Sequence, residues 1–362
     1  MGDAPSTAQA WDQIKQKAEA LINAATTRTF HIGQRTVTTS VLSELGKIAM
    51  GAQYISQRLQ IKSLLPPNTV VVLGSGLGRL ADEAEVLLEI NFSDVPGFPR
   101  PKSVPAGHAG KFVFARVQTD SGPRYALLMK GRVHQYQDLT PEESVRYVRM
   151  LRLLGIAQFI LTNAAGALPH TESGEQRRLG DLVVSRYQLP YDQSSSPFRF
   201  KHGLSRFGAD DFQGFPTLDE LTLWKKLAAV FSQHEFIGKR KDNGPMVHWG
   251  GNETLAMQNG PNYELPGMIR AAQKMGATLF GMSSVWELMA VLQGYHAANT
   301  EKPEYQYVGP AEGLIITNVT NIASGIEGAV PDHSDVAEQA KQSYPFFAAV
   351  IKAALGAIAE PE

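Results

Sequence analysis

The chain of 362 residues contains no cysteine, and this absence removes several kinds of chemistry at once. Disulfide bonds, cysteine-ligated zinc and thiol nucleophiles are all excluded. An excess of charge of one sign is also missing, because 34 Lys and Arg stand against 35 Asp and Glu, for a formal net charge of −1. Nucleic acid is therefore not an expected partner. With 43 % hydrophobic and 19 % charged residues, the composition is typical of a soluble globular protein.

Long hydrophobic runs are absent as well. No window reaches the roughly 18 uninterrupted apolar residues that a membrane-spanning helix requires. Residues 1–25 lack the basic start and the apolar run of a secretory signal. We therefore expect a cytoplasmic protein that has no membrane partner.

Two kinds of periodicity divide the chain. From Trp11 to Leu59, apolar residues recur at spacings of three and four, which predicts two helices flanking an extended piece at Thr36–Thr39. From Thr69 onward, short apolar runs typical of strands buried on both faces alternate with helical segments. This alternation predicts an α/β fold, a single domain with a mixed, mostly parallel central sheet flanked by helices on both faces.

The expected elements follow from these runs. The expected strands cover residues 70–73, 112–117, 125–129, 159–161, 182–185, 278–281 and 313–317. The expected helices cover residues 142–154, 221–231, 266–275 and 285–294. Long loops of the kind that form lids are expected at 169–180, 193–214 and 295–310. We expect one domain at 61–362, with residues 1–60 as a helical N-terminal extension that packs on it.

Three segments are candidates for binding an anion. The strand at 70–73 runs into Gly74-Ser75-Gly76-Leu77-Gly78, where backbone amides and a hydroxyl can approach a phosphate closely, although a tight turn explains the glycines more simply. Arg132 and His134 are two residues apart, so an extended backbone projects both to one side, where they can grip an oxyanion. A surface arginine beside a half-buried histidine is the other explanation. His108 either serves the same anion or holds its own loop.

Other segments suit a sugar or a planar base. Thr162–Gly166 offers a small-residue backbone for such a ligand, or simple packing. Tyr263 beside Glu264 offers a stacking face and an acceptor for ring N–H donors, or a turn with a capping carboxylate. Met282 and Ser283 follow a predicted strand at the end where α/β folds bind ligands, although core packing explains the methionine too.

Eight short stretches, spread in order over roughly residues 70–336, resemble the trimeric purine nucleoside phosphorylases. They are LGSGLG from Leu73, VPGFPR from Val95, GHAG from Gly107, GRVHQY from Gly131, TNAAGAL from Thr162, GPNYE from Gly260, GMSSV from Gly281, and TNIASGI from Thr320 with His333 after it. The resemblance implies a pentosyltransferase of purine salvage that cleaves purine ribonucleosides reversibly with inorganic phosphate. It also implies a homotrimer without cofactor or metal, with phosphate as co-substrate.

The same resemblance implies a site with three compartments. Phosphate would be held by Ser75, Arg132, His134, Ser283 and the amide of Ala164, with His108 close by as its orienter. Ribose would lie on Met282 and be bounded by Tyr136, Tyr263 and His333. The base would be read by Glu264 and Asn321, with Thr320 beside them and Tyr263 stacking on the ring. The catalytic residues would be Asn321, Glu264 and His134.

Some features leave the substrate open. Asparagine at position 321 implies inosine, guanosine and their deoxy analogues rather than adenosine. Asn318, in a neighbouring Thr-Asn pair, is an alternative base reader, although the spacing to His333 favours Asn321. Leu265 and Trp286 depart from the family's pattern and can reshape the base pocket. The alternatives are a nucleoside-binding homologue with weakened or absent catalysis and a methylthioadenosine phosphorylase, which would call for an aspartate at 321.

Overall fold

The structure is a computed structural model. It describes residues 44–101, 110–169, 177–192, 196–197, 216, 218–233, 242–293, 311–322 and 333–359, together with residues 12 and 16 and the strand backbone at 28–32 and 35–39. The helix predicted near Trp11 and the loops predicted at 193–214 and 295–310 fall almost wholly outside these residues.

The described elements alternate between strands and helices along the chain. The helices are α2 (Glu44–Ile61), α3 (Arg79–Glu83), α4 (Pro141–Leu153), α5 (Thr222–Phe231), α6 (Pro266–Lys274), α7 (Val285–Leu292) and α8 (His333–Ile358). The strands are β1 (Arg28–Ile32), β2 (Arg35–Thr39), β3 (Thr69–Leu73), β4 (Glu85–Asn91), β5 (Lys111–Thr119), β6 (Gly122–Lys130), β7 (Gln158–Ala167), β8 (Leu182–Val184), β9 (Tyr187–Pro190), β10 (Val247–His248), β11 (Thr254–Met257), β12 (Leu279–Gly281) and β13 (Glu312–Ile322). Each strand and helix predicted between residues 70 and 317 is present within these bounds or close to them.

An eleven-stranded sheet forms the centre of the molecule. Its main path runs β10-β8-β13-β7-β3-β6-β5-β4, and β12, β11 and β9 branch from β7. Strands β13, β7, β3 and β6 run parallel to one another, whereas β4, β5 and β6 form an antiparallel meander. The predicted α/β fold with a mixed, mostly parallel sheet is therefore confirmed.

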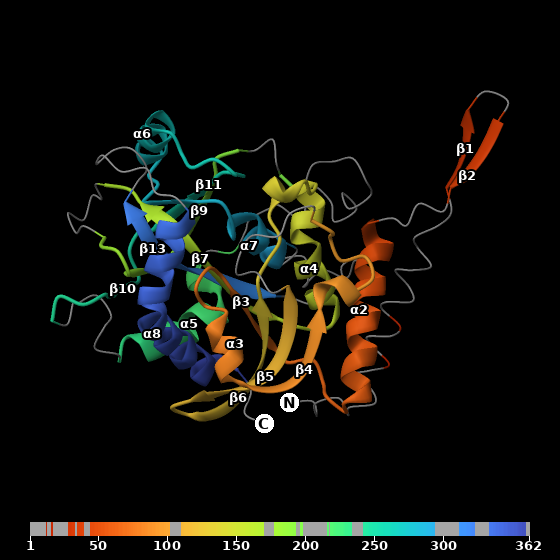
Figure 1. Ribbon diagram of the computed structural model, residues 1–362, viewed down its shortest axis with the longest axis horizontal. Helices are drawn as coiled ribbons and strands as arrows, with labels where there is room; N and C mark the ends of the chain where they lie inside the picture. The colour runs from red at the N-terminus through yellow and green to blue at the C-terminus, as the bar shows by residue number, and fades with distance from the viewer. Residues whose placement is uncertain are drawn as a thin grey trace.

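Helices cover both faces of this sheet. Figure 1 shows α4 and α7 on one side and α5 and α8 on the other. All five residues of β3, TVVVL, are buried, as expected for a central strand that is covered on both faces. The start of α4 is fixed by a capping box, in which Thr140 Oγ1 accepts from Glu143 N at 3.3 Å and Glu143 Oε2 accepts from Thr140 N at 3.0 Å.

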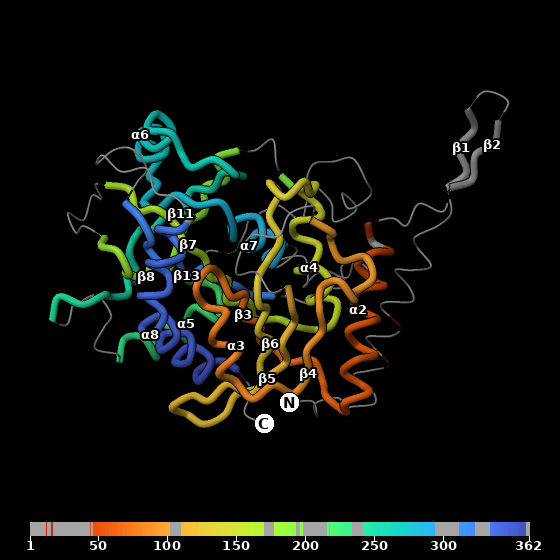
Figure 2. The backbone as a smooth tube through the Cα atoms, viewed as in Figure 1, coloured from red at the N-terminus to blue at the C-terminus, as the bar shows by residue number. Residues whose placement is uncertain are grey.

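Helix α2 packs on α4 and belongs to the same hydrophobic core as the sheet. Figure 2 shows α2 running beside α4. Ile48, Ile55 and Leu59 of α2 are buried in the main core. Glu44 pairs with Arg146 of α4, an interaction that joins the start of α2 to the middle of α4. The assignment of residues 1–60 to an N-terminal extension stays a prediction.

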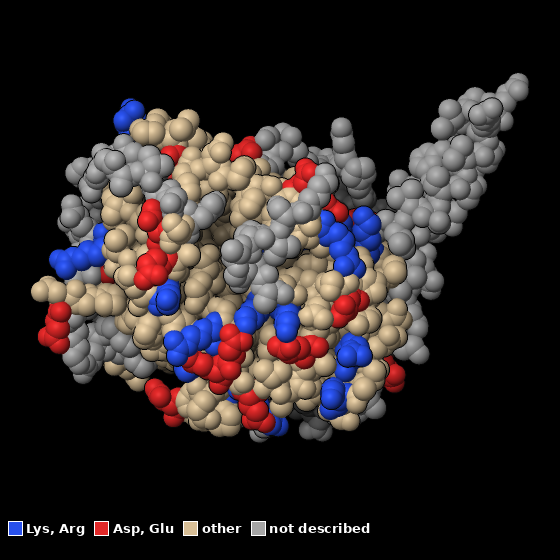
Figure 3. Space-filling model, in the orientation of Figure 1, with Lys and Arg blue, Asp and Glu red and all other residues tan. Residues whose placement is uncertain are grey.

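The described surface carries mixed charge. On the face drawn in Figure 3, basic and acidic side chains intermingle, and the coloured residues form no broad field of one sign. Lys111 pairs with Glu89 at 2.9 Å and Arg116 with Glu85 at 2.7 Å across β4 and β5.

Of the helices in the described part of the chain, none combines the length and apolar character needed to cross a membrane.

Candidate active site

A pocket lies at the edge of the sheet where the parallel strands end. Ser75 follows β3, Arg132 follows β6, and β7 and β13 contribute residues from their carboxyl halves. Because the carboxyl ends of parallel strands meet at one edge of a sheet, segments far apart in sequence converge there. The pocket has about 660 Å³ of empty space, its opening to solvent included.

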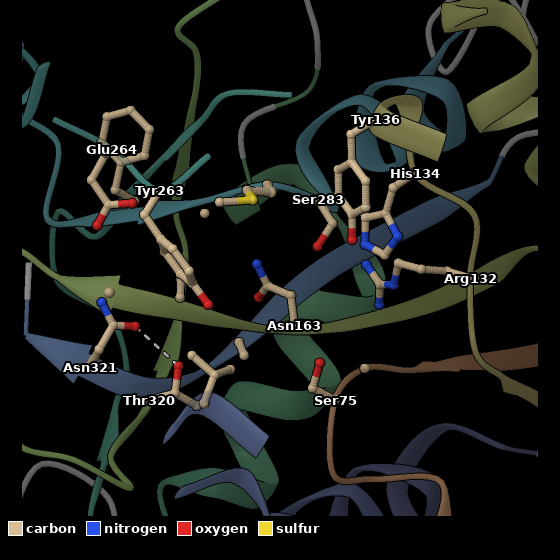
Figure 4. A pocket seen from close by; sticks show the side chains of 18 residues that line it. Ser75, Arg132, His134, Tyr136, Asn163, Tyr263, Glu264, Ser283, Thr320 and Asn321 are labelled. Carbon is tan, nitrogen blue, oxygen red and sulfur yellow. Dashed lines mark hydrogen bonds between the residues drawn. The ribbon is translucent and has the colours of Figure 1, made fainter. Parts of the chain in front are cut away.

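Most of the predicted site residues line this pocket. Those that do are Ser75, Arg132, His134, Tyr136, Ala164, Tyr263, Glu264, Met282, Ser283, Thr320 and Asn321. The structure does not place the other two predicted residues, because His108 and the side chain of His333 lie outside the described residues. Figure 4 shows Arg132, His134 and Ser283 gathered at one end and Glu264 and Asn321 at the other, with Asn163 between them.

The guanidinium of Arg132 is buried and held by three acceptors. Nη1 donates to Ser284 Oγ at 2.7 Å and to Glu287 Oε2 at 3.0 Å, and Nη2 donates to the carbonyl oxygen of Thr162. A guanidinium has five N–H donors. Nε and one hydrogen of Nη2 are therefore left without a partner in the described part of the chain. These two donors suit an oxyanion in the pocket.

Glu287 is the buried counter-ion of Arg132. The Arg132 and Glu287 side chains are 2 % and 6 % exposed, and Glu287 Oε1 accepts from the hydroxyl of Tyr147 on α4. Burial, together with the Glu287 carboxylate, raises the pKa of Tyr147 well above its ordinary value, so this hydroxyl stays protonated and donates. Glu287 was not among the residues predicted for the site, although a single carboxylate in the apolar run VWELMAVL is a signal of a buried ion pair.

His134 and Ser284, which lie next to Arg132, each have a distinctive local structure. The backbone N–H of His134 donates to Gln137 Oε1 at 2.6 Å, and the imidazole stacks on the Tyr136 ring with centroids 4.8 Å apart. Ser284 has a left-handed backbone, with φ of 77°, between Ser283 and the start of α7. A non-glycine residue in this conformation costs about 1–3 kcal/mol, and such strain collects at ligand sites.

The opposite end of the pocket carries an amide and a carboxylate. Asn321 Oδ1 accepts from Thr320 Oγ1 at 3.3 Å, while Asn321 Nδ2 is buried with no hydrogen-bond partner among the described residues. Glu264 is 3 % exposed. The register of β13 against β7 shifts between Val319 and Asn321, so Thr320 is an extra residue in a bulge. Because a bulge interrupts strand alternation, Thr320 and Asn321 both line the pocket.

Two other asparagines stand near this site, and only one of them lines the pocket. Asn163, which sequence reasoning did not single out, accepts from Thr317 Oγ1 at 2.7 Å. Its Nδ2 is buried and has no hydrogen-bond partner in the part of the chain that the structure describes. Asn318, the alternative base reader, is 1 % exposed and is not among the pocket residues. Asn163 therefore offers the pocket a further donor.

Comparison with known proteins agrees with this geometry. Residues 68–356 match the family model of the phosphorylase superfamily. Purine nucleoside phosphorylase 1 of Geobacillus stearothermophilus is 29 % identical over 309 residues, which is 84 % of this chain and 95 % of the relative. The purine nucleoside phosphorylase of Mycobacterium leprae is 30 % identical over 289 residues, which is 79 % of this chain and 86 % of the relative. A crystal structure of a Schistosoma purine nucleoside phosphorylase in complex with hypoxanthine has a TM-score of 0.64 at 21 % identity and covers 87 % of this chain and 97 % of that one. The fold, the pocket and these matches together place the chain in the phosphorylase superfamily, as a member of its nucleoside phosphorylase family.

Proposed function

We propose that this protein catalyses the reversible phosphorolysis of purine ribonucleosides, namely inosine, guanosine and their deoxy analogues, to free base and ribose 1-phosphate. One observation carries the proposal: a single pocket has a cationic end at Arg132 and an amide-and-carboxylate end at Asn321 and Glu264. The names of the relatives and the hypoxanthine bound by the Schistosoma enzyme support it.

We assign the inorganic phosphate to the end that holds Arg132. Arg132 lines this pocket together with Ser75, Ser283, His134 and Ala164, which can supply hydroxyl, imidazole and backbone N–H donors. Asn163 Nδ2 adds a donor. Hydrogen bonds between charged groups are stronger than neutral ones, so Arg132 supplies most of the attraction for a dianion. His108 stays the proposed orienter of this cluster.

The chemistry follows from the charges that develop as the glycosidic bond breaks. The bond between C1′ and the purine nitrogen breaks with its electron pair going to the base, and a phosphate oxygen forms a new bond to C1′. Positive charge grows on the ribosyl ring and negative charge on the purine, so stabilisation is needed at both ends. Hydrogen phosphate beneath C1′ acts as nucleophile and counter-charge, and it loses its proton as the ester forms, while the departing base takes up one proton.

The other residues then have separate tasks. Asn321 Nδ2 donates to a ring nitrogen of the leaving purine, while the Thr320 hydroxyl holds Oδ1 and so sets the orientation of the amide. Glu264 accepts from the ring N–H of a 6-oxopurine. Met282 and Tyr136 enclose the sugar, with Tyr263 stacking on the base and His333 closing the sugar side.

Inosine and guanosine are expected to be better substrates than adenosine. Glu264 needs a ring N–H to accept from, and adenine presents a bare acceptor nitrogen at that position, so two acceptors would face each other. A site built to bind an N–H discriminates strongly against an analogue that lacks it, here by about 100-fold or more in kcat/KM. Steady-state kinetics at fixed phosphate measure this ratio, and equal values for inosine and adenosine would contradict the role of Glu264.

Replacing Gly166 with alanine is expected to damage base recognition and spare phosphate binding. A Cβ at this position would lie 2.6 Å from Asn321 Nδ2 and 3.3 Å from Glu264 Oε1. We expect KM for inosine to rise about tenfold or more with KM for phosphate little changed, since the loss falls on contacts to the nucleoside. Gly267→Ala is the control, because its added Cβ meets nothing within 4 Å. An unchanged KM for inosine would contradict the placement of the base.

The proposal is tested by incubating the protein with inosine, guanosine, adenosine or methylthioadenosine, with and without phosphate. Phosphorus NMR should show ribose 1-phosphate in step with release of hypoxanthine or guanine, and only when phosphate is present. Preference for methylthioadenosine would replace the proposal with a methylthioadenosine phosphorylase. Tight nucleoside binding without turnover would replace it with a nucleoside-binding homologue.

We further propose that the protein works as a cytoplasmic homotrimer in purine salvage and uses no cofactor or metal. The family resemblance is what supports each of these points. Light scattering in solution should give the mass of three chains, and a chelator should leave the rate unchanged.

A further inference from the structure

Thr162 stands where two parts of the proposed phosphate site meet. It lies in β7 and is fully buried, with 0 % exposure. Its hydroxyl accepts from Gly74 N at 2.8 Å and donates to Val72 O at 2.7 Å, and its carbonyl oxygen accepts from Arg132 Nη2. One residue therefore contacts both the start of the Ser75 loop and the guanidinium of Arg132.

The hydroxyl of Thr162 binds the backbone of β3 and its loop at the point where the pairing of β3 with β7 ends. The parallel register of β3 and β7 runs from Thr69 opposite Gln158 to Val72 opposite Leu161, and goes no further. Just beyond it, the Thr162 hydroxyl binds both Val72 O and Gly74 N. This side chain therefore satisfies backbone groups at the point where β3 leaves the sheet and becomes the loop.

The loop also rests directly on the backbone of Thr162. A Cβ on Gly74 would lie 2.6 Å from the Thr162 carbonyl oxygen and 3.0 Å from the Cα of Asn163, so only glycine fits this approach. The carbonyl oxygen that limits this space is the one that accepts from Arg132. The position of Ser75 and the position of the guanidinium are thus set by the same peptide unit.

We propose that Thr162 is a positioning residue for phosphate, which fixes the spacing between the Ser75 loop and the Arg132 guanidinium. Thr162 is not among the residues that line the pocket, so it acts through its neighbours rather than by touching substrate. The inference rests on the proposed function, because it assigns the oxyanion to this end of the pocket. A misplacement of about 1 Å in such a site costs up to about 100-fold in rate.

The test compares Thr162→Val with Thr162→Ser and Thr69→Val. Valine keeps the shape and removes the hydroxyl, whereas serine keeps the hydroxyl. Thr69 is the matched control, since it is also 0 % exposed and its hydroxyl donates to Gln158 Oε1 at 2.9 Å, at the far end of the same strand pair. We expect KM for phosphate to rise about tenfold or more in Thr162→Val, with KM for inosine within about twofold of the parent. Thr162→Ser and Thr69→Val should both keep the parent KM for phosphate.

Two results would overturn the inference. One is a Thr162→Val enzyme whose KM for phosphate stays within about twofold of the parent value, and the other is an equal rise in Thr69→Val. If Thr162→Val does not fold, Thr162→Ala removes the same hydroxyl with less bulk and is compared with Thr162→Ser in the same way.

A binding measurement separates this inference from the proposed function. If the parent protein cleaves no nucleoside, the proposed function fails, and the rise in Tm on adding inorganic phosphate alone still tests Thr162. That rise should be present in the parent, Thr162→Ser and Thr69→Val and lost in Thr162→Val. Equal rises in all four proteins would contradict a positioning role.

Discussion

Replacing Arg132 with methionine is expected to lower kcat/KM for phosphorolysis by about three orders of magnitude and to destabilise the fold. Removing a preorganised donor costs about 100- to 1,000-fold, and Arg132 supplies both a charge and two N–H donors that no described residue accepts from. The substitution also leaves Glu287 buried without its counter-ion, since the two side chains are 2 % and 6 % exposed. We expect a loss of about 3–5 kcal/mol in the free energy of unfolding, measured by denaturant titration.

A double variant separates these two effects. In Arg132→Met with Glu287→Gln, no charge is left unpaired, and the Tyr147 hydroxyl can still donate to the new amide. The free energy of unfolding should recover most of the loss, whereas kcat/KM should stay at the level of the single variant. An Arg132→Met enzyme with kcat/KM within about tenfold of the parent would show that the phosphate is held elsewhere.

Replacing Asn321 with alanine is expected to remove about 2–4 kcal/mol of transition-state stabilisation, because the donor to the leaving purine is lost. The amide is preorganised for this task, since Thr320 holds its oxygen and its Nδ2 has no partner among the described residues. The change should appear mainly in kcat with inosine and should leave KM for phosphate nearly unaltered.

Asn318→Ala is the matched control for that experiment. Asn318 carries the same side chain on the same strand, three residues earlier, but it is not among the pocket residues. Its replacement should change kcat/KM by less than about threefold. If kcat/KM changes by less than about threefold in Asn321→Ala and falls strongly in Asn318→Ala, then Asn318 and not Asn321 is the base reader.

The fold could be predicted where the sequence pattern depends on local burial. β3, β7 and β13 read as apolar runs because both faces of each strand are covered. β4 was missed because it lies at the edge of the sheet and alternates exposed and buried positions under a charged sequence. α8 was missed because Pro345 interrupts its helical pattern, yet the helix continues through it where Phe347 and Ile351 are buried in the core.

The candidate site could be predicted only in part, for a different reason. Short motifs such as GRVHQY and GPNYE indicate candidate side chains, and the ones predicted from them line one pocket: Arg132, His134, Tyr136, Tyr263 and Glu264. The contacts that hold the motifs in place join segments far apart in the chain, and no motif indicates which segments meet: Arg132 contacts Thr162 30 residues away and Glu287 155 residues away. The tertiary fold brings them together, since Thr162 lies in β7 and Glu287 in α7. The roles of His108 and His333 stay predictions.

A crystal of the protein grown with hypoxanthine and sulfate tests the central claim most directly, because it locates both ligands at once. We predict sulfate within hydrogen-bond distance of Arg132 and Ser75, and hypoxanthine between Asn321 and Glu264, on opposite sides of the space left for the sugar. A sulfate bound away from Arg132, or a base held in a separate cavity, would contradict phosphorolysis in this pocket.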